Sequence, residues 1–431
     1  MLSGDQPGPP DDAIDLVLAA AVLLHVNGQS TNMTVTAVDR LNRGLNTRGT
    51  LIPEWAALFL VRPGAATRVA AVSPTGVSMR RVATAMAVID RAEDGPLDRD
   101  AVREGLAAAQ RESVSNTLIF STACATGAGA LAVIFGAQHP LTVLVAAVSA
   151  ALGGLVRRGV GHLGAGILTQ AFAAALVAGL IAVAAVHLRV DDALGIVVLC
   201  PAMVLVPGPH ILNGALDLLA LRMTPGIARL GYAALILAAI AAGLILGLAA
   251  DGRSLAVVGT SSTVPLYVDV IAAGIAAGSY PVFFSMPYRM IGWPVAIGML
   301  AHAAHWWGLT VWHLEIATAA LVSCLIAGIL LVPISHYLRM PFAAIGFASV
   351  VALVPGVYVF RMLSGLEQFA HLPTSNLLTS LTSDGAVAML VIAGMATGLA
   401  VPMHAYSTLS AAADKRRNQH RWWMPPEPRS A

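Results

Sequence analysis

From residue 116 onward the sequence contains one apolar segment after another, each close to the length that crosses a lipid bilayer. A membrane-spanning helix needs roughly 20 predominantly apolar residues, and soluble domains do not contain such segments in series. The ten segments are residues 116–136, 140–156, 165–187, 192–212, 227–249, 263–285, 291–307, 314–334, 342–361 and 385–406. The sequence therefore predicts a mainly α-helical, polytopic membrane protein with ten transmembrane helices.

Charged residues are scarce and unevenly distributed along the chain. They make up 11% of it, against about 25% in average soluble proteins, and 24 of the 48 fall in the first 115 residues. This distribution predicts a water-facing start, a membrane body and a short basic tail. We expect a cytoplasmic N-terminal domain at 1–115, two five-helix transmembrane repeats at 116–250 and 251–407, and a basic cytoplasmic tail at 408–431.

The composition also disfavours several classes of partner. The net charge of +2 provides no electrostatic footprint for nucleic acid. The cysteines, Cys124, Cys200 and Cys324, are odd in number and each lies in an apolar run, so we expect neither a disulfide framework nor a zinc site. No phosphate-binding loop is recognisable. We therefore expect no metal, no cofactor and no nucleic-acid partner, and we leave a homo-oligomer open.

The first 115 residues have the pattern of a small α/β domain. Ala13–Val26 has only 14 apolar-rich residues, too few for a spanning helix, and is interpreted as a buried soluble helix. A membrane location for this segment would reverse the orientation. Further helices are expected at Ser30–Leu45, Val77–Arg91 and Asp100–Glu112, and a β-hairpin at Trp55–Arg62 and Thr67–Val72.

No pairing of nucleophile and base is recognisable in these 115 residues, so the sequence does not predict an enzyme. A membrane enzyme or sensor whose activity lies in the N-terminal domain is kept as an alternative of a different class. An assay that follows the chemical integrity of the transported molecule separates the two.

The positive-inside rule predicts the orientation of the helices. Ten spans place both chain ends on one side, and the basic residues 415–421 after the last span favour the cytoplasm for that side. The loops show the same bias. The cytoplasmic loops contain Arg157, Arg158, Arg222, Arg289 and Arg339, and the opposite loops contain Arg189, Arg253 and Arg361. We expect a protein of the cell (inner) membrane with both termini in the cytoplasm.

A short motif occurs twice and predicts an internal repeat. Leu205-Val206-Pro207-Gly208 recurs 148 residues later as Leu353-Val354-Pro355-Gly356. The same offset carries the first predicted span onto the sixth, so each half contains five helices with the motif in the fourth. Because five is odd, the second half enters the membrane from the opposite side, which is the inverted repeat of many secondary transporters.

Each motif should break its helix, because proline removes a helical hydrogen bond and glycine adds backbone freedom. Broken helices are tolerated at membrane depth where they are buried or line a cavity, and the N-terminus of a half-helix attracts a carboxylate. We therefore predict that Pro207, Gly208, Pro355 and Gly356 bind substrate. The alternative is a simple proline kink in each helix.

Two aspartates in the predicted spans are candidates for proton coupling, because a charge at bilayer depth is costly and normally functional. Asp269 lies in the sixth span and could alternate between protonated and ionised forms; the alternative is a solvated position at the interface. Asp217 follows the first Pro-Gly pair and either faces the cavity or caps the cytoplasmic end of its helix.

Other polar residues of the spans have alternative interpretations. His210 and Asn213 follow the first Pro-Gly pair and could hydrogen-bond the substrate, although a histidine satisfied by protein neighbours is equally compatible. His302 and His305 lie on one face of the seventh span. Beside two tryptophans they are interpreted as structural residues near the interface, since two histidines alone make a poor metal site.

The segment LVPGPHILNGALDLLALRMTPGIARL, residues 205–230, resembles the signature of the threonine/serine exporter family. PVFFSMPYRMIGWPVAIG from Pro281 and ALVPG from Ala352 resemble the second part of that family. Positions that fall on the two family motifs are Pro207, Gly208, Asn213, Asp217, Gly226, Arg229, Pro287, Arg289, Gly298, Pro355 and Gly356. In the early helix Gly28 and Thr31 agree with the family, whereas its Arg and Glu are absent.

The resemblance implies a cytoplasmic N-terminal domain, a ten-helix body and export of threonine and serine driven by the proton gradient. The partners are then a small amino acid, protons and the lipid bilayer, and we assign Arg229 and Arg289 structural or gating roles. A split two-protein relative that handles a dicarboxylate keeps a dicarboxylate exporter as the alternative substrate class.

Overall fold

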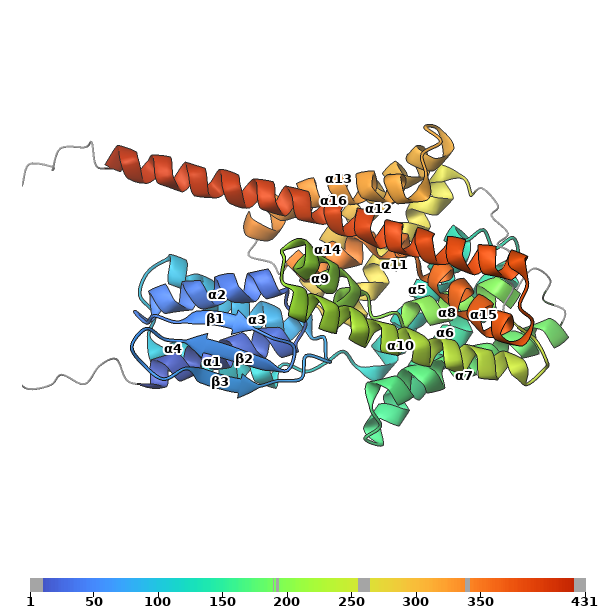
Figure 1. The fold of residues 1–431 in the computed structure, drawn as a ribbon, viewed down its shortest axis with the longest axis horizontal. Coiled ribbons are helices and arrows are strands. Elements are labelled where there is room, and N and C mark those ends of the chain that lie inside the picture. Colours follow the sequence, from blue (N-terminus) through green and yellow to red (C-terminus); the bar gives the residue numbers. More distant parts are fainter. Residues whose placement is uncertain (1–10, 189, 191–193, 255–263, 338–341, 422–431) are drawn as a thin grey trace, which may run out of the picture.

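The computed structural model describes residues 11–188, 190, 194–254, 264–337 and 342–421. It consists of an N-terminal region with a small sheet at one end of the molecule and a larger helical body (Figure 1). The C-terminal end of the last helix extends beyond the body toward the end of the molecule that holds the N-terminal region. The mainly helical character predicted from the sequence is confirmed.

The N-terminal region, residues 11–115, packs helices against a three-stranded sheet. Its elements are α1 (Asp11–Val26), α2 (Thr31–Gly44), β1 (Thr50–Pro53), β2 (Ala57–Val61), β3 (Arg68–Ala71), α3 (Met79–Ile89), the 3₁₀ turn η1 (Asp90–Glu93) and α4 (Arg99–Arg111). The strands are antiparallel in the order β1-β2-β3, with Leu51 opposite Leu60 and Phe59 opposite Val69. The β2–β3 pair agrees with the predicted hairpin, and β1 is an addition.

Helix α1 is buried in this region and is not a candidate membrane span. Val17, Ala20 and Leu24 are fully buried, and the helix has only 16 residues. Ser30 caps α2 by accepting a hydrogen bond from the N–H of Met33, and Asp98 caps α4 through the N–H of Ala101. Such caps satisfy backbone donors that the first turn leaves free.

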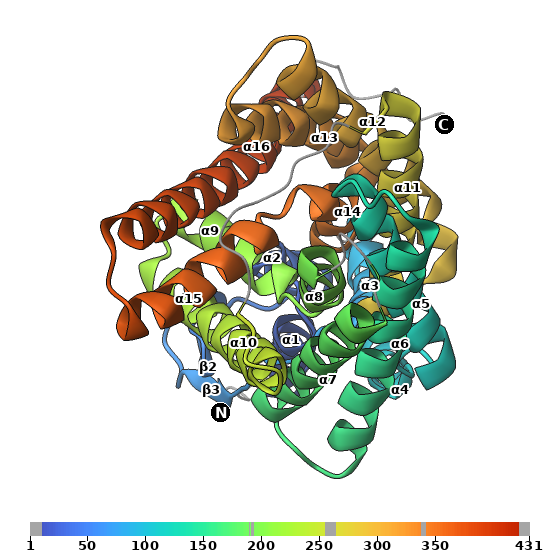
Figure 2. The ribbon, with the colours of Figure 1, turned by 90° about the vertical axis from the view of Figure 1, so that its right-hand side faces the viewer.

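The helical body consists of longer helices around two pairs of shorter ones. Its elements are α5 (Thr117–Ile134), α6 (Pro140–His162), α7 (Ile167–His187), α8 (Leu194–Val204), α9 (Gly208–Leu219), α10 (Met223–Ala249), α11 (Leu266–Phe283), η2 (Tyr288–Met290), α12 (Gly292–Thr310), α13 (Ile316–Tyr337), α14 (Phe342–Val350), η3 (Val351–Leu353), α15 (Gly356–His371) and α16 (Ser375–Arg421). The short helices α8 and α14 lie near the centre of the body (Figure 2).

Seven described helices are long and apolar enough to cross a membrane, and the number rises to nine if each bent pair is one span. The seven are α5, α6, α7, α10, α11, α13 and α16. The bent pairs are α8 with α9, at 65°, and residues 345–353 with α15, at 57°. Both predicted breaks are therefore present, because each bend falls at a Pro-Gly pair. Helix α12, which the prediction of ten spans includes, is not among these candidates.

The packing of neighbouring helices in α5–α10 recurs in α11–α16. Helix α7 packs on α10 as α13 packs on α16, and α5 packs on α6 as α11 packs on α12. Glycines spaced four residues apart on α10 and on α16 allow these helices to approach α7 and α13 closely. A Cβ at Gly247 would lie 2.7 Å from the Leu176 carbonyl oxygen, and one at Gly398 would lie 2.6 Å from that of Leu321. Small residues allow such close helix contact in membranes.

Two parts of the sequence-based topology need correction or lie outside the description. Arg361 does not lie in a loop: it lies within α15, with its Nε 3.2 Å from Oδ2 of Asp384 in α16. Arg189, predicted in a loop opposite the cytoplasm, and Arg339, predicted in a cytoplasmic loop, lie outside the described residues.

The N-terminal region is joined to the body through a continuous hydrophobic core. This core runs from α1–α4 into α11–α14 and α16. Backbone hydrogen bonds add to it, because the N–H of Met79 donates to the Phe284 carbonyl at 2.7 Å and that of Arg80 to the Ser285 carbonyl at 2.9 Å. The C-terminal end of α11 therefore faces the N-terminal region, and its first turn lies at the far end.

Candidate functional site

The two helix breaks have the same backbone geometry. Pro207 and Pro355 both have φ of −79°, with ψ of 58° and 43°. In each case the following glycine donates its N–H to the carbonyl of the residue before the proline at 2.8 Å, for Gly208 to Val206 and for Gly356 to Val354. This is close to an inverse γ-turn centred on the proline. Both bends therefore have the same local cause, a tight turn centred on a proline that is followed by glycine.

The two breaks also pack against each other. Gly208 lies against the ring of Phe347 in α14, so closely that a Cβ would overlap the ring. In return, a Cβ at Gly356 would lie 3.1 Å from the Cγ of Met203 in α8. A small apolar cavity lies between the two breaks, with Gly208 and Pro355 both in its wall. The two motifs, 148 residues apart in sequence, thus meet in the interior.

The first turns of α9 and α15, the helices that follow the two breaks, differ in the backbone N–H groups that remain without a hydrogen bond. At α9, Pro209 has no N–H and the N–H of His210 already donates to the Pro207 carbonyl at 3.0 Å. At α15, the N–H of Tyr358 makes no backbone hydrogen bond to the described residues. Residues Val357 and Tyr358 line a larger cavity. The second break is consequently the one whose helix N-terminus can receive an anion.

That larger cavity has a volume of about 380 Å³ and is named here the Asp269 cavity. It lies between the first turn of α11, the C-terminal half of α12 and the start of α15. Its polar and aromatic lining includes Asp269, His302, His305, Trp306, Thr310 and Tyr358, beside Pro355. Its volume is within the range of small-molecule sites.

Asp269 and His302 form a buried pair in this cavity. Oδ2 of Asp269 lies 2.6 Å from Nδ1 of His302, and each side chain is only 6% exposed. The solvated alternative for Asp269 is therefore excluded. His305 follows one turn later with its ring centroid 5.9 Å from that of His302, and its Nδ1 is buried with no hydrogen-bond partner in the described part of the chain.

The Asp269 cavity lies far from the N-terminal region. Asp269 is in the first turn of α11, and the residue after the last turn contacts Met79. At 1.5 Å per residue, the 15 steps from Asp269 to Phe284 place Asp269 about 22 Å along the helix from that contact. The cavity and the N-terminal region therefore lie toward opposite ends of the helical body.

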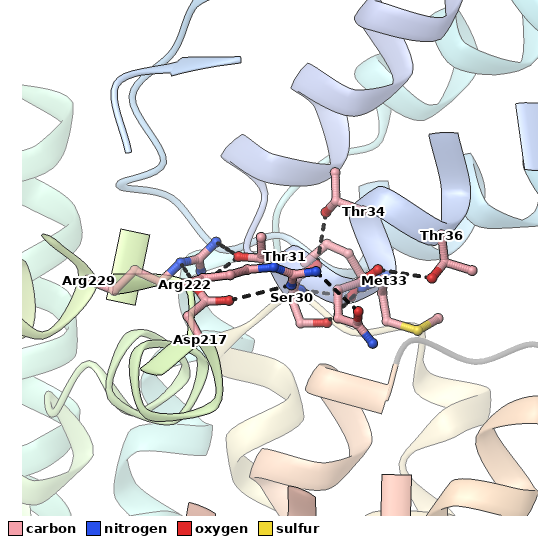
Figure 3. Close-up of polar contacts among 10 residues, drawn as sticks. Ser30, Thr31, Met33, Thr34, Thr36, Asp217, Arg222 and Arg229 are labelled. Atoms are coloured by element: carbon pink, nitrogen blue, oxygen red, sulfur yellow. Dashed lines mark hydrogen bonds and ion pairs between the residues drawn. The ribbon is translucent and has the colours of Figure 1, made fainter. Parts of the chain in front are cut away.

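Asp217 has a different environment, at the contact between α9 and the N-terminal region (Figure 3). The hydroxyl of Thr31 donates to its Oδ2 at 2.8 Å, and Nε of Arg229 lies 3.2 Å from the same oxygen. Arg229, from α10, is the largest fully buried side chain in the described chain. The buried carboxylate of Asp217 thus lies beside an arginine, which stays charged, and accepts a hydrogen bond from a hydroxyl group.

The turn between α1 and α2 brings Thr31 to this position. Gly28 has φ of +92°, a conformation that favours glycine, and its carbonyl accepts a hydrogen bond from Nδ2 of Asn213 at 3.2 Å. Ser30 then caps α2, so Thr31 occupies the first helical residue and points toward Asp217 (Figure 3). Gly28 and Thr31 thus both contact residues of the segment 205–230.

The aromatic cluster beside Asp217 covers His210. The His210 ring packs edge-on against Trp55 from the N-terminal region and Tyr232 from α10, at centroid distances of 6.3 and 5.0 Å. His25 of α1 is fully buried, and its burial and the positive charge of Arg229 lower its pKa from 6.5 to about 4. The contact between the N-terminal region and the helical body therefore shields both histidines from water.

The predicted site residues therefore lie in three places. Pro207, Gly208, Pro355 and Gly356 meet at the crossing of the broken helices, and Asp269 lies in the cavity next to that crossing. The others lie elsewhere: His210, Asn213, Asp217 and Arg229 lie at the contact with the N-terminal region, and Arg289 is exposed on η2.

Sequence reasoning did not pair His302 with Asp269. Its spacing from His305 was recognised, but its partner lies on another helix, 33 residues away. The only local signal was an aspartate in one apolar span and a histidine in the next.

Comparison with known families gives two matches. The model described as a putative threonine/serine exporter matches residues 15–250, and the model described as a threonine/serine exporter, ThrE, matches residues 269–405. The division between the two matches falls between α10 and α11, where the packing pattern of the helices begins to recur. No solved structure matches the chain.

Proposed function

The chain belongs to the threonine/serine exporter family, and on this premise we propose that it is a secondary transporter that exports threonine and serine across the cell (inner) membrane, driven by the proton gradient. The observation that carries this proposal is the crossing of the two broken helices beside the Asp269 cavity. It combines a helix N-terminus for a carboxylate with a buried carboxylate for a cation, as a zwitterionic amino acid requires.

The proposed topology is ten helices in two inverted five-helix repeats, with α12 as the seventh span. It is supported by the recurring neighbours of the helices and by the shared turn geometry of the two breaks. Both termini are assigned to the cytoplasm, because the charge-rich N-terminal region and the C-terminal end of α16 extend to the same end of the molecule (Figure 1). The Asp269 cavity is then on the outer side.

Asp269 is the better candidate for proton coupling of the two aspartates. Its partner is the imidazole of His302, a type of group that proteins use in both neutral and protonated forms, whereas the guanidinium beside Asp217 stays charged. We assign Asp217 and Arg229 to a gating contact between the N-terminal region and the first repeat.

A dicarboxylate substrate fits this cavity less well. The described lining has one aspartate and no lysine or arginine, and Arg361 is already paired with Asp384. A doubly negative substrate would need more fixed positive charge next to it than the two histidines supply.

Counterflow in proteoliposomes tests the proposal. Vesicles loaded with unlabelled threonine should accumulate labelled threonine and serine, and the recovered label should be chemically unchanged. A parallel series with succinate serves as the competing substrate. Accumulation of succinate without threonine would overturn the substrate class, and chemical conversion of the label would instead support an enzyme.

A further inference from the structure

We propose that Asp269 binds the ammonium group of the amino acid substrate and the protonated His302 in turn, so that substrate and proton exchange for each other at one carboxylate. This rests on the proposed function and adds the residue pair that recognises the substrate and couples it to the proton. The proposal comes from the chemistry of the Asp269 cavity, in which the polar groups surround a single carboxylate.

The cavity contains complementary groups for both ends of an amino acid. Asp269 is the one acidic residue in the described lining and can receive an ammonium group. The N-terminus of α15, with the N–H of Tyr358, lies in the same cavity and can receive the carboxylate. The buried Nδ1 of His305 is an additional polar group without a partner in the described chain. The remainder of the wall is largely apolar, which suits a small side chain.

The geometry of the pair makes the two cations competitors. Oδ2 of Asp269 lies 2.6 Å from Nδ1 of His302, and each side chain is only 6% exposed. A buried carboxylate requires a partner, and the imidazolium supplies it when no substrate is present. Two cations on one buried carboxylate would repel each other, so arrival of the ammonium group favours loss of the proton shared by the pair.

The exchange balances in atoms and charge. An aspartate–imidazolium pair and a zwitterion become an aspartate–ammonium pair, a neutral imidazole and one released proton. On the outer side the reverse step releases the amino acid and takes up a proton, and on the cytoplasmic side substrate binding discharges it. No bond other than the N–H bond of His302 is made or broken. Protons thus enter the cell as the amino acid leaves, at one proton per zwitterion.

Among the described residues that line the cavity, the other titratable groups lie on α12 and α15. They are His305 and Tyr358; the described lining residues from α5, α13 and α16 are apolar. His302 is the one among them in contact with the Asp269 carboxylate. The pH dependence of substrate binding should therefore follow the Asp269–His302 pair.

Equilibrium exchange of labelled threonine by the full-length reconstituted protein, at equal pH on both sides, tests the competition. In the unaltered protein the apparent affinity should fall as the pH is lowered from about 7.5 to about 5.5, by up to about tenfold per pH unit once the pair is protonated. His302→Gln keeps a hydrogen-bond donor for Asp269 but cannot carry the proton. It should exchange threonine with an affinity independent of pH and lose gradient-driven accumulation.

His139→Gln is the matched control, because His139 is exposed before α6 and is not among the residues that line the cavity. It should keep both the pH slope and the accumulation. A second test uses the unaltered protein with a threonine analogue in which a hydroxyl replaces the ammonium group. The analogue should not compete with labelled threonine at any pH.

The outcomes separate the two proposals. No exchange of threonine by the unaltered protein would overturn the proposed function itself. Exchange by the unaltered protein, with a His302→Gln variant that keeps its pH slope and accumulation, would overturn only the shared carboxylate. Competition by the ammonium-free analogue as strong as that of threonine would overturn it as well, even if the variant did not fold.

Discussion

Two buried aspartates show how differently one carboxylate can be used in the two halves of this protein. Asp217 and Asp269 are 3% and 5% exposed. Asp217 lies between an arginine and a threonine hydroxyl and joins the first half to the N-terminal region. Asp269 lies in a cavity beside a histidine. Burial alone therefore does not distinguish the two aspartates as candidates for proton coupling. The chemistry of the partner distinguishes them, because an imidazolium can lose a proton and a guanidinium does not.

The largest effect is expected at Asp217. Asp217→Ala leaves Arg229 as an uncompensated buried charge, which costs about 3–5 kcal/mol of folding free energy. Thermal or denaturant unfolding in detergent measures the loss. The matched change Asp100→Ala removes an aspartate that is 86% exposed and should have a far smaller effect. Equal stability of the two variants would show that the Asp217 contact does not hold the regions together.

The next effect is a dependence of stability on pH that comes from His25. Its pKa is about 4 in the folded protein and 6.5 in the unfolded chain. Because the unfolded chain takes up the proton first, the stability present above about pH 6.5 is lost as the pH falls to about 4, by about 3 kcal/mol. Denaturant unfolding across this range should show a shallower decline for His25→Gln than for the unaltered protein. An identical decline would contradict a dry environment around His25.

Thr31→Val tests the hydroxyl that joins the N-terminal region to Asp217. Loss of a hydrogen bond to a charged group costs about 1.5–3 kcal/mol. Thr36→Val is the control, because Thr36 lies on the same helix and its exposed hydroxyl bonds only to the Asn32 carbonyl at 3.0 Å. Unfolding midpoints of the two variants should differ clearly. If they coincide, Thr31 contributes no more than a surface threonine.

The smallest effects compare the two helix breaks. Gly208→Ala would overlap the buried Phe347 ring and should cost about 1–3 kcal/mol, as overpacking usually does. Gly356→Ala meets the flexible side chain of Met203 at 3.1 Å and should cost less. Unfolding midpoints of the two variants provide the measurement. A larger loss at Gly356 would contradict the packing described for the crossing.

The breaks could be predicted because proline and glycine act locally. Pro207-Gly208 and Pro355-Gly356 bend their helices for reasons contained in the two residues themselves. Likewise, Ser30 and Asp98 mark helix starts by bonds within three residues. The strand β1 was missed because it has only four residues and ends at Pro53, too short for a periodic pattern.

The partners of the two aspartates could not be predicted, because each pairing depends on tertiary packing. Asp217 bonds to Thr31, 186 residues away, through a turn that depends on Gly28. Asp269 meets His302 because α11 packs on α12 with both residues on the shared face. Polar residues in apolar spans can therefore be recognised from the sequence, whereas the fold determines which partners they have.

Proton flux during threonine transport tests the central claim most directly. Proteoliposomes that contain a trapped pH-sensitive dye should report one proton moving opposite to each labelled threonine, and Asp217→Asn should keep that ratio in whatever fraction folds. Asp269→Asn should abolish gradient-driven transport. Threonine transport with no opposing proton movement in the unaltered protein, or full gradient-driven transport by Asp269→Asn, would contradict the account.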